Sequence, residues 1–113
     1  MHEMSIARSL IQLVEREAED KGFSRVEAIS LKIGEFSGLV PQCLIDFFPY
    51  AAEGTIAQGA KLEIEQLPAA FRCLDCGYEG AVDPGQALCP SCGSAALRMT
   101  QGTGFYVDSL KVE

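Results

Sequence analysis

Residues 73–93 read CLDCGYEGAVDPGQALCPSCG, and this stretch decides how the chain is organised. It contains the motif C-x-x-C-G twice, at 73–77 and at 89–93. Two residues between cysteines allow a tight turn that directs both sulfurs at one metal ion, and the glycine that follows tolerates a positive φ. The pattern predicts a tetrahedral four-thiolate site for zinc or iron, with the ligands Cys73, Cys76, Cys89 and Cys92.

A closed four-thiolate site has no open coordination position, so we expect it to be structural rather than catalytic. From residue 69 to residue 102 the apolar periodicity is lost and glycines and cysteines dominate, which predicts an insert held together by the metal. The fifth cysteine, Cys43, has no partner in the sequence, and we interpret it as a small buried thiol.

The sequence before the insert predicts two helices. Apolar residues recur at steps of three and four over 4–21, which is one stripe of an α-helix: Met4, Ala7, Leu10, Ile11, Val14 and Ala18. Pro41 suits the first turn of a second helix, with an expected apolar face of Leu44, Ile45, Phe48, Ala51 and Ala52. Because Pro49 cannot donate a hydrogen bond to the carbonyl of Ile45, we expect a kink or an early end there.

Three segments alternate with period two and predict strands: 26–34, a second one around Leu62 and Ile64 that stops at Pro68, and 105–112. The fold class is therefore α+β: a three-stranded sheet with two helices, plus an inserted zinc-ribbon or rubredoxin-like knuckle module. We expect residues 1–68 to form the first domain, completed by the C-terminal strand 103–113, and residues 69–102 to form the module.

Composition and charge exclude some classes of function. Nine basic and sixteen acidic residues give a formal charge of −7, which repels phosphate backbones and makes nucleic acid an unexpected partner. No stretch of about 18 apolar residues predicts a membrane span, and we see no signal-peptide pattern. We therefore expect the reducing cytoplasm, where paired cysteines bind metal rather than form disulfides.

His2 is the only histidine in the chain. Histidine is bulky, so we expect Met1 to be retained, which places an α-amine, an amide nitrogen and an imidazole within one short span beside Glu3. Such a nitrogen set suits square-planar nickel(II). Considered alone, however, a histidine near a terminus is commonly an idle, solvated side chain.

Several segments together resemble the HypA/HybF family of hydrogenase nickel-insertion accessory proteins. They are the opening MHEMSIA of residues 1–7, LKIGEFS at 31–37, GTIAQGAKL at 54–62, the paired knuckles and the ending DSLKVE at 108–113. The resemblance implies a nickel site at Met1, His2 and Glu3 and structural zinc on the four cysteines.

The resemblance also implies a non-enzymatic metallochaperone that passes nickel(II) to the large-subunit precursor of a [NiFe]-hydrogenase. Its implied partners are a GTPase accessory protein and, in some organisms, urease accessory proteins. We expect a monomer or a weak homodimer. Two alternatives remain: a rubredoxin-like iron electron carrier and a zinc-ribbon adaptor protein.

Overall fold

A computed structural model of the chain describes residues 2–83 and 85–113, with only the backbone of His2. In chain order the elements are α1 (His2–Lys21), β1 (Val26–Gly34), α2 (Pro41–Ala52), β2 (Lys61–Leu67), β3 (Ala70–Cys73), β4 (Glu79–Gly80), β5 (Leu97–Gln101) and β6 (Phe105–Val112). Two compact units divide them: Met1–Lys32 with Gly38–Glu65 and Tyr106–Glu113, and Ile33–Ser37 with Gln66–Phe105.

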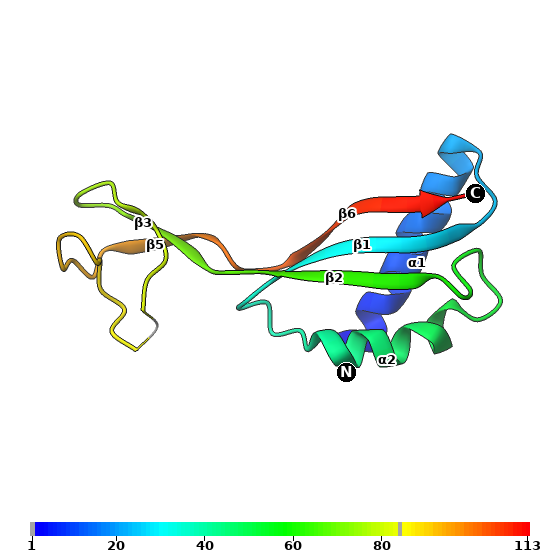
Figure 1. Ribbon diagram of the computed structural model, residues 1–113, viewed down its shortest axis with the longest axis horizontal. Helices are drawn as coiled ribbons and strands as arrows, with labels where there is room; N and C mark the ends of the chain where they lie inside the picture. The colour runs from blue at the N-terminus through cyan, green and yellow to red at the C-terminus, as the bar shows by residue number, and fades with distance from the viewer. Residues whose placement is uncertain (1, 84) are drawn as a thin grey trace. The chain divides into compact units, whose positions relative to one another are not determined.

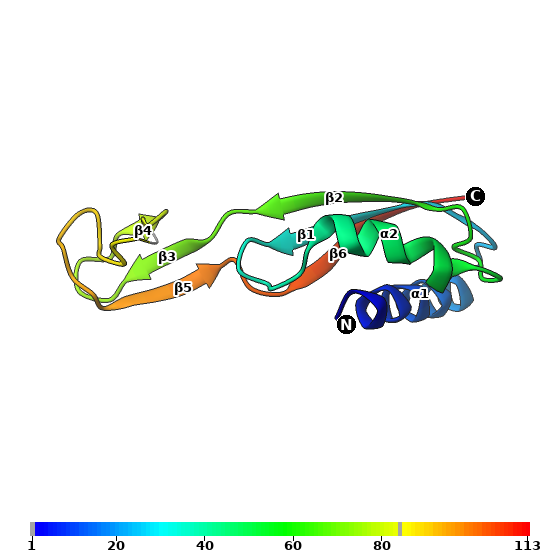
Figure 2. The ribbon, with the colours of Figure 1, turned by 90° about the horizontal axis from the view of Figure 1, so that it is seen from below.

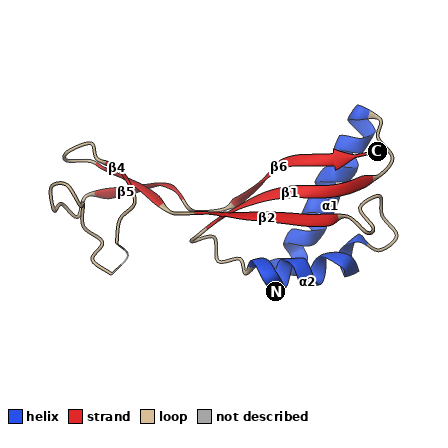
Figure 3. Ribbon diagram, viewed as in Figure 1, coloured by secondary structure: helices blue, strands red, loops and turns tan. Residues whose placement is uncertain are grey.

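The first unit is built on a three-stranded sheet in the order β2-β1-β6. β1 and β2 run in the same direction and β6 runs opposite to them, while α1 and α2 lie together against one face of the sheet (Figures 1 and 2). The α+β class, with two helices on a three-stranded sheet, is therefore confirmed (Figure 3). The C-terminal strand β6 pairs with β1 in this sheet.

The core of this unit follows the predicted periodicities. Four members of the α1 stripe are buried: Ala7, Leu10, Ile11 and Val14. Ile29 and Leu31 of β1 are buried in the same unit. Burying a large aliphatic side chain contributes about 1.5–3 kcal/mol, so these rows account for much of the folding energy of the unit.

Helix α2 differs from its prediction in two ways. It begins with Pro41 as expected but continues past Pro49 to Ala52, so the early end is wrong. Pro49 lies on the exposed side of the helix, where water can replace the missing backbone donor. Ile45 is also exposed, at 39%, because the buried stripe is narrower than expected and consists of Leu44, Phe48 and Ala52.

The second unit contains a small sheet in the order β4-β3-β5, which the loss of periodicity in the sequence did not reveal. β3 pairs antiparallel with both neighbours, with Arg72 opposite Glu79 on one side and opposite Arg98 on the other. The hairpin between β3 and β4 encloses the first knuckle. β5 then leads back toward the last strand, so the knuckles are supported by antiparallel pairing as well as by their own turns.

Segment Ile33–Ser37 belongs to the second unit because its backbone is bonded there on two sides. The Glu35 N–H donates to the Leu67 carbonyl at 2.9 Å, and the Phe36 N–H donates to the Gly102 carbonyl at 2.7 Å. The chain passes so close to residue 102 that a Cβ on Gly34 would lie 2.3 Å from the Gly102 carbonyl oxygen. Glycine at position 34 is therefore a steric requirement.

Candidate metal centres

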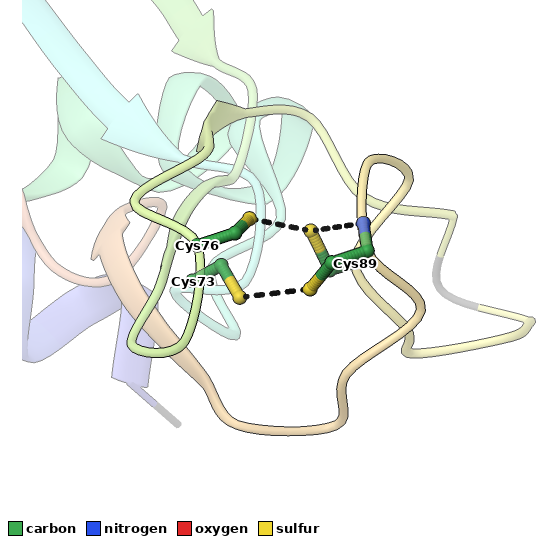
Figure 4. Close-up of side chains that lie close together, drawn as sticks. Cys73, Cys76 and Cys89 are labelled. Atoms are coloured by element: carbon green, nitrogen blue, oxygen red, sulfur yellow. Dashed lines mark hydrogen bonds between the residues drawn. The ribbon is translucent and has the colours of Figure 1, made fainter.

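The structure brings the four knuckle cysteines into one cluster. Their sulfurs lie within 4.8 Å of one another, and the Sγ–Sγ distances Cys73–Cys92 and Cys76–Cys89 are both 3.6 Å (Figure 4). A disulfide would need about 2.05 Å, whereas a tetrahedral ion with metal–sulfur bonds of about 2.3 Å separates its sulfurs by about 3.8 Å. The donor set therefore fits a four-coordinate metal.

The two knuckles have the same local geometry. The N–H of Gly77 donates to the Cys73 carbonyl at 3.0 Å, and the N–H of Gly93 donates to the Cys89 carbonyl at 2.9 Å. Both glycines have positive φ, 79° and 78°, as the motif predicts. The backbone amides of Ser91 and Cys92 point at the Cys89 sulfur at 3.4 and 3.5 Å, where they can stabilise a thiolate.

A polar bridge joins the knuckles. The Ser94 hydroxyl, just after the second knuckle, donates to the carboxylate of Asp75 inside the first. The same hydroxyl accepts the Ala96 N–H at 3.0 Å, and the Leu74 N–H donates to the Ala96 carbonyl at 2.8 Å. Contacts between the knuckles that need no metal ion thus position the cluster.

Ionisation differs between the four thiols. Burial raises the pKa of the Cys89 thiol, but hydrogen bonds from the backbone amides of Cys92 and Ser91, together with the thiols of Cys76 and Cys92, outweigh burial and lower this pKa to about 7. The Ser94 amide lowers the pKa of Cys92, but burial and the three neighbouring thiols outweigh it and raise that pKa to about 12. A divalent ion offsets the repulsion between thiolates, so metal binding must displace protons from the cluster.

Zinc affinity should therefore fall as the pH is lowered from 8 to 6. Below about pH 7 the Cys89 thiol becomes protonated too, so one more proton must leave when zinc binds and the decline becomes steeper. Competition with a chelator at a series of pH values, with calorimetry in buffers of different ionisation enthalpy, measures both the affinity and the protons released. An affinity independent of pH across this range would contradict thiolate ligation.

The predicted N-terminal site is placed only in part. Met1 lies outside the described residues, and His2 is described by its backbone alone, which begins α1. Glu3 is half-buried in the first turn, and its Oε2 accepts the backbone N–H of Val40 at 3.3 Å.

The fifth cysteine, Cys43, was predicted to be a buried thiol, but it is half-buried.

Glu35 makes a contact that the sequence did not indicate. Its Oε1 accepts the N–H of Ala69 at 3.1 Å, and both residues belong to the second unit. Thirty-four positions separate the two residues, so no local pattern in the sequence could have indicated this bond.

Fold and cluster define a class: a small metalloprotein in which an α/β unit is joined to a four-cysteine knuckle unit. The family described as "Hydrogenase/urease nickel incorporation, metallochaperone, hypA" matches residues 1–112. The chain belongs to this HypA family of nickel metallochaperones, which are hydrogenase maturation factors and not enzymes.

Individual relatives agree with this assignment. The chain is 40% identical over 108 residues to a hydrogenase maturation factor HypA of Moorella thermoacetica, covering 96% of each protein. It is similar to a solution structure of a HypA protein with a TM-score of 0.77 and 28% identity, over 100% of this chain and 97% of that one. The solution structure of the Ni metallochaperone HypA from Helicobacter pylori gives a TM-score of 0.72 and 25% identity, over 97% and 96%.

Among the described helices, none has the length and apolar character that crossing a membrane requires.

Proposed function

We propose that this chain binds nickel(II) through the Met1 α-amine, the His2 amide and imidazole and the Glu3 residue. It holds structural zinc on Cys73, Cys76, Cys89 and Cys92. The observation that carries the proposal is that a nickel-incorporation family matches a chain whose single imidazole is at residue 2. Nitrogen donors suit nickel(II), whereas the four thiols fit a separate, closed site.

The start of α1 supports this assignment. Because the helix begins at His2, the amide of residue 2 lies in its first turn. An N–H group at this position has no acceptor within the helix. Nickel can therefore replace the proton of the residue 2 amide without breaking a helical hydrogen bond.

Delivery would proceed by ligand exchange. A site whose donors come from three consecutive residues binds nickel and still releases it to a better-organised acceptor. The intrinsic affinity order favours copper(II) over nickel(II), so selectivity comes from metal supply and from partner proteins.

The acceptor we propose is the large-subunit precursor of a [NiFe]-hydrogenase, reached in the cytoplasm with a GTPase accessory protein, or with urease accessory proteins where urease is served. We assign nickel binding to 1–68 with 103–113, zinc binding to 69–102, and a monomer or weak homodimer to the chain. Its charge of −7 disfavours nucleic acid as a partner.

The first test is a nickel titration of the untagged protein and of His2→Ala, followed by absorbance and proton release. We expect one nickel per chain in the wild type and an affinity about a hundredfold weaker or worse in His2→Ala, because the imidazole and its chelate ring are lost. Zinc content should be equal in both. Equal nickel binding by the two proteins, or none by either, would refute the terminal site.

The identity of the second metal is tested separately. Cys76 and Cys92 are exposed, and so are the neighbouring Leu74 and Leu88. Because two of its four cysteines are exposed, the cluster would give a redox iron little shielding from water, which favours zinc over the rubredoxin-like alternative. A colourless protein with one zinc per chain supports the proposal, whereas a red protein containing iron would favour the electron carrier.

A further inference from the structure

The carboxylate of Glu3 has a structural partner next to the proposed nickel donors. Its Oε2 accepts the N–H of Val40, which is 37 positions away in the sequence and is the residue at the N-cap position of α2. Both residues belong to the first unit, where α1 and α2 pack together.

Helix α2 lacks a cap from its own sequence. Its N-cap residue Val40 makes no side-chain capping hydrogen bond, and its first turn contains no acidic residue. In a capping box, a Glu or Gln at the third helical position accepts the N–H of the capping residue. In α2 the third helical position is Cys43, so Glu3 supplies from another helix the bond that the local sequence lacks.

The same carboxylate lies in the first turn of α1. Helix N-termini carry partial positive charge, so one carboxylate serves the positive ends of both helices. If the Glu3 carboxylate bound a metal ion instead, the start of α2 would lose this hydrogen-bond acceptor. The Glu3 backbone amide, by contrast, can take part in nickel binding while the carboxylate stays bonded to Val40.

We infer that Glu3 acts in nickel binding as a positioning residue: its carboxylate holds the first turn of α1 against the start of α2 and is not itself a nickel ligand. The inference rests on the proposed nickel site for its function, whereas the contact with Val40 can be tested without metal. It predicts that an uncharged acceptor of the same shape can replace the carboxylate.

The experiment compares the wild type with Glu3→Gln and Glu3→Ala, and uses Glu15→Ala, an exposed position on the same helix, as the matched control. Nickel affinity is measured by chelator competition and the donor set by the d–d absorption band. Hydrogen exchange of the Val40 amide is measured in protein without nickel. Circular dichroism verifies that each variant is folded.

We expect Glu3→Gln to bind nickel within about threefold of the wild type with an unchanged band, since its amide oxygen still accepts the Val40 N–H. Glu3→Ala should bind about tenfold more weakly, again with an unchanged band, and its Val40 amide should exchange about tenfold faster. Glu15→Ala should match the wild type in every measurement.

Other results would overturn the inference. If Glu3→Gln loses as much affinity as Glu3→Ala, or shifts the band, the carboxylate is a ligand. If Glu3→Ala binds as tightly as the wild type, the residue has no role. If the wild type binds no nickel, the proposed function fails, and an unchanged Val40 exchange rate in Glu3→Ala would separately show that the contact is not formed.

Discussion

Cys73→Ser is expected to lose the proposed zinc ion and to unfold the second unit while the first unit stays folded. Cys73 ends β3, is 1% exposed and lies 3.6 Å from the Cys92 sulfur. Structural zinc contributes about 10–16 kcal/mol of binding energy to small zinc-stabilised folds. Replacing one of four thiolates by a hydroxyl should weaken zinc binding by about a thousandfold or more, which is about 4 kcal/mol.

The division of the chain makes this outcome measurable. Both helices belong to the first unit, so the helical circular dichroism should change little, whereas amide signals from residues 66–105 should collapse into the unfolded range. Elemental analysis of the purified variant should find far less than one zinc per chain.

Cys43→Ser is the matched control, because Cys43 lies on α2 and outside the cluster. It should retain zinc and the wild-type spectrum. A Cys73→Ser variant that retains both would show that the cluster is not what holds the second unit together.

Local patterns in the sequence predicted the elements that are governed by local physics. The alternation of 26–34 matches β1, the stripe of 4–21 lies within α1, and Pro41 begins α2. The repeated C-x-x-C-G motif predicted four sulfurs around one point, because each knuckle needs only its own turn to aim both of its cysteines.

Such local patterns could not predict contacts between segments that are distant in the sequence. The bond from Ala69 to Glu35 and the bond from Val40 to Glu3 join residues more than thirty positions apart. Nothing in the sequence distinguishes either carboxylate from an exposed one. The partner in each case is the N–H of a distant backbone segment, which only the folded chain brings near. Ile45 shows the same dependence on packing, because helical spacing alone placed it on the buried face.

The close passage of Gly34 and Gly102 leads to the second large effect: Gly34→Ala should destabilise the protein by about 3 kcal/mol or more. The new Cβ would lie 2.3 Å from the Gly102 carbonyl oxygen and 2.8 Å from the Thr103 nitrogen. Both obstacles are backbone atoms. The N–H of Gly34 donates to the Gly104 carbonyl at 2.9 Å, so neither segment can move apart without losing hydrogen bonds. Urea unfolding followed by amide signals of the second unit measures the loss.

Gly22→Ala is the informative comparison, because it separates crowding from backbone conformation. Gly22 follows α1 with a φ of +79°, and a Cβ at this position would meet nothing within 4 Å, so alanine there costs only the left-handed strain of about 1 kcal/mol. Ranking glycines by positive φ alone would place Gly22 above Gly34, whose φ lies outside that region. The contacts reverse this order. Equal losses in the two variants, or a smaller one in Gly34→Ala, would mean that the segments at residues 34 and 102 are not packed backbone to backbone.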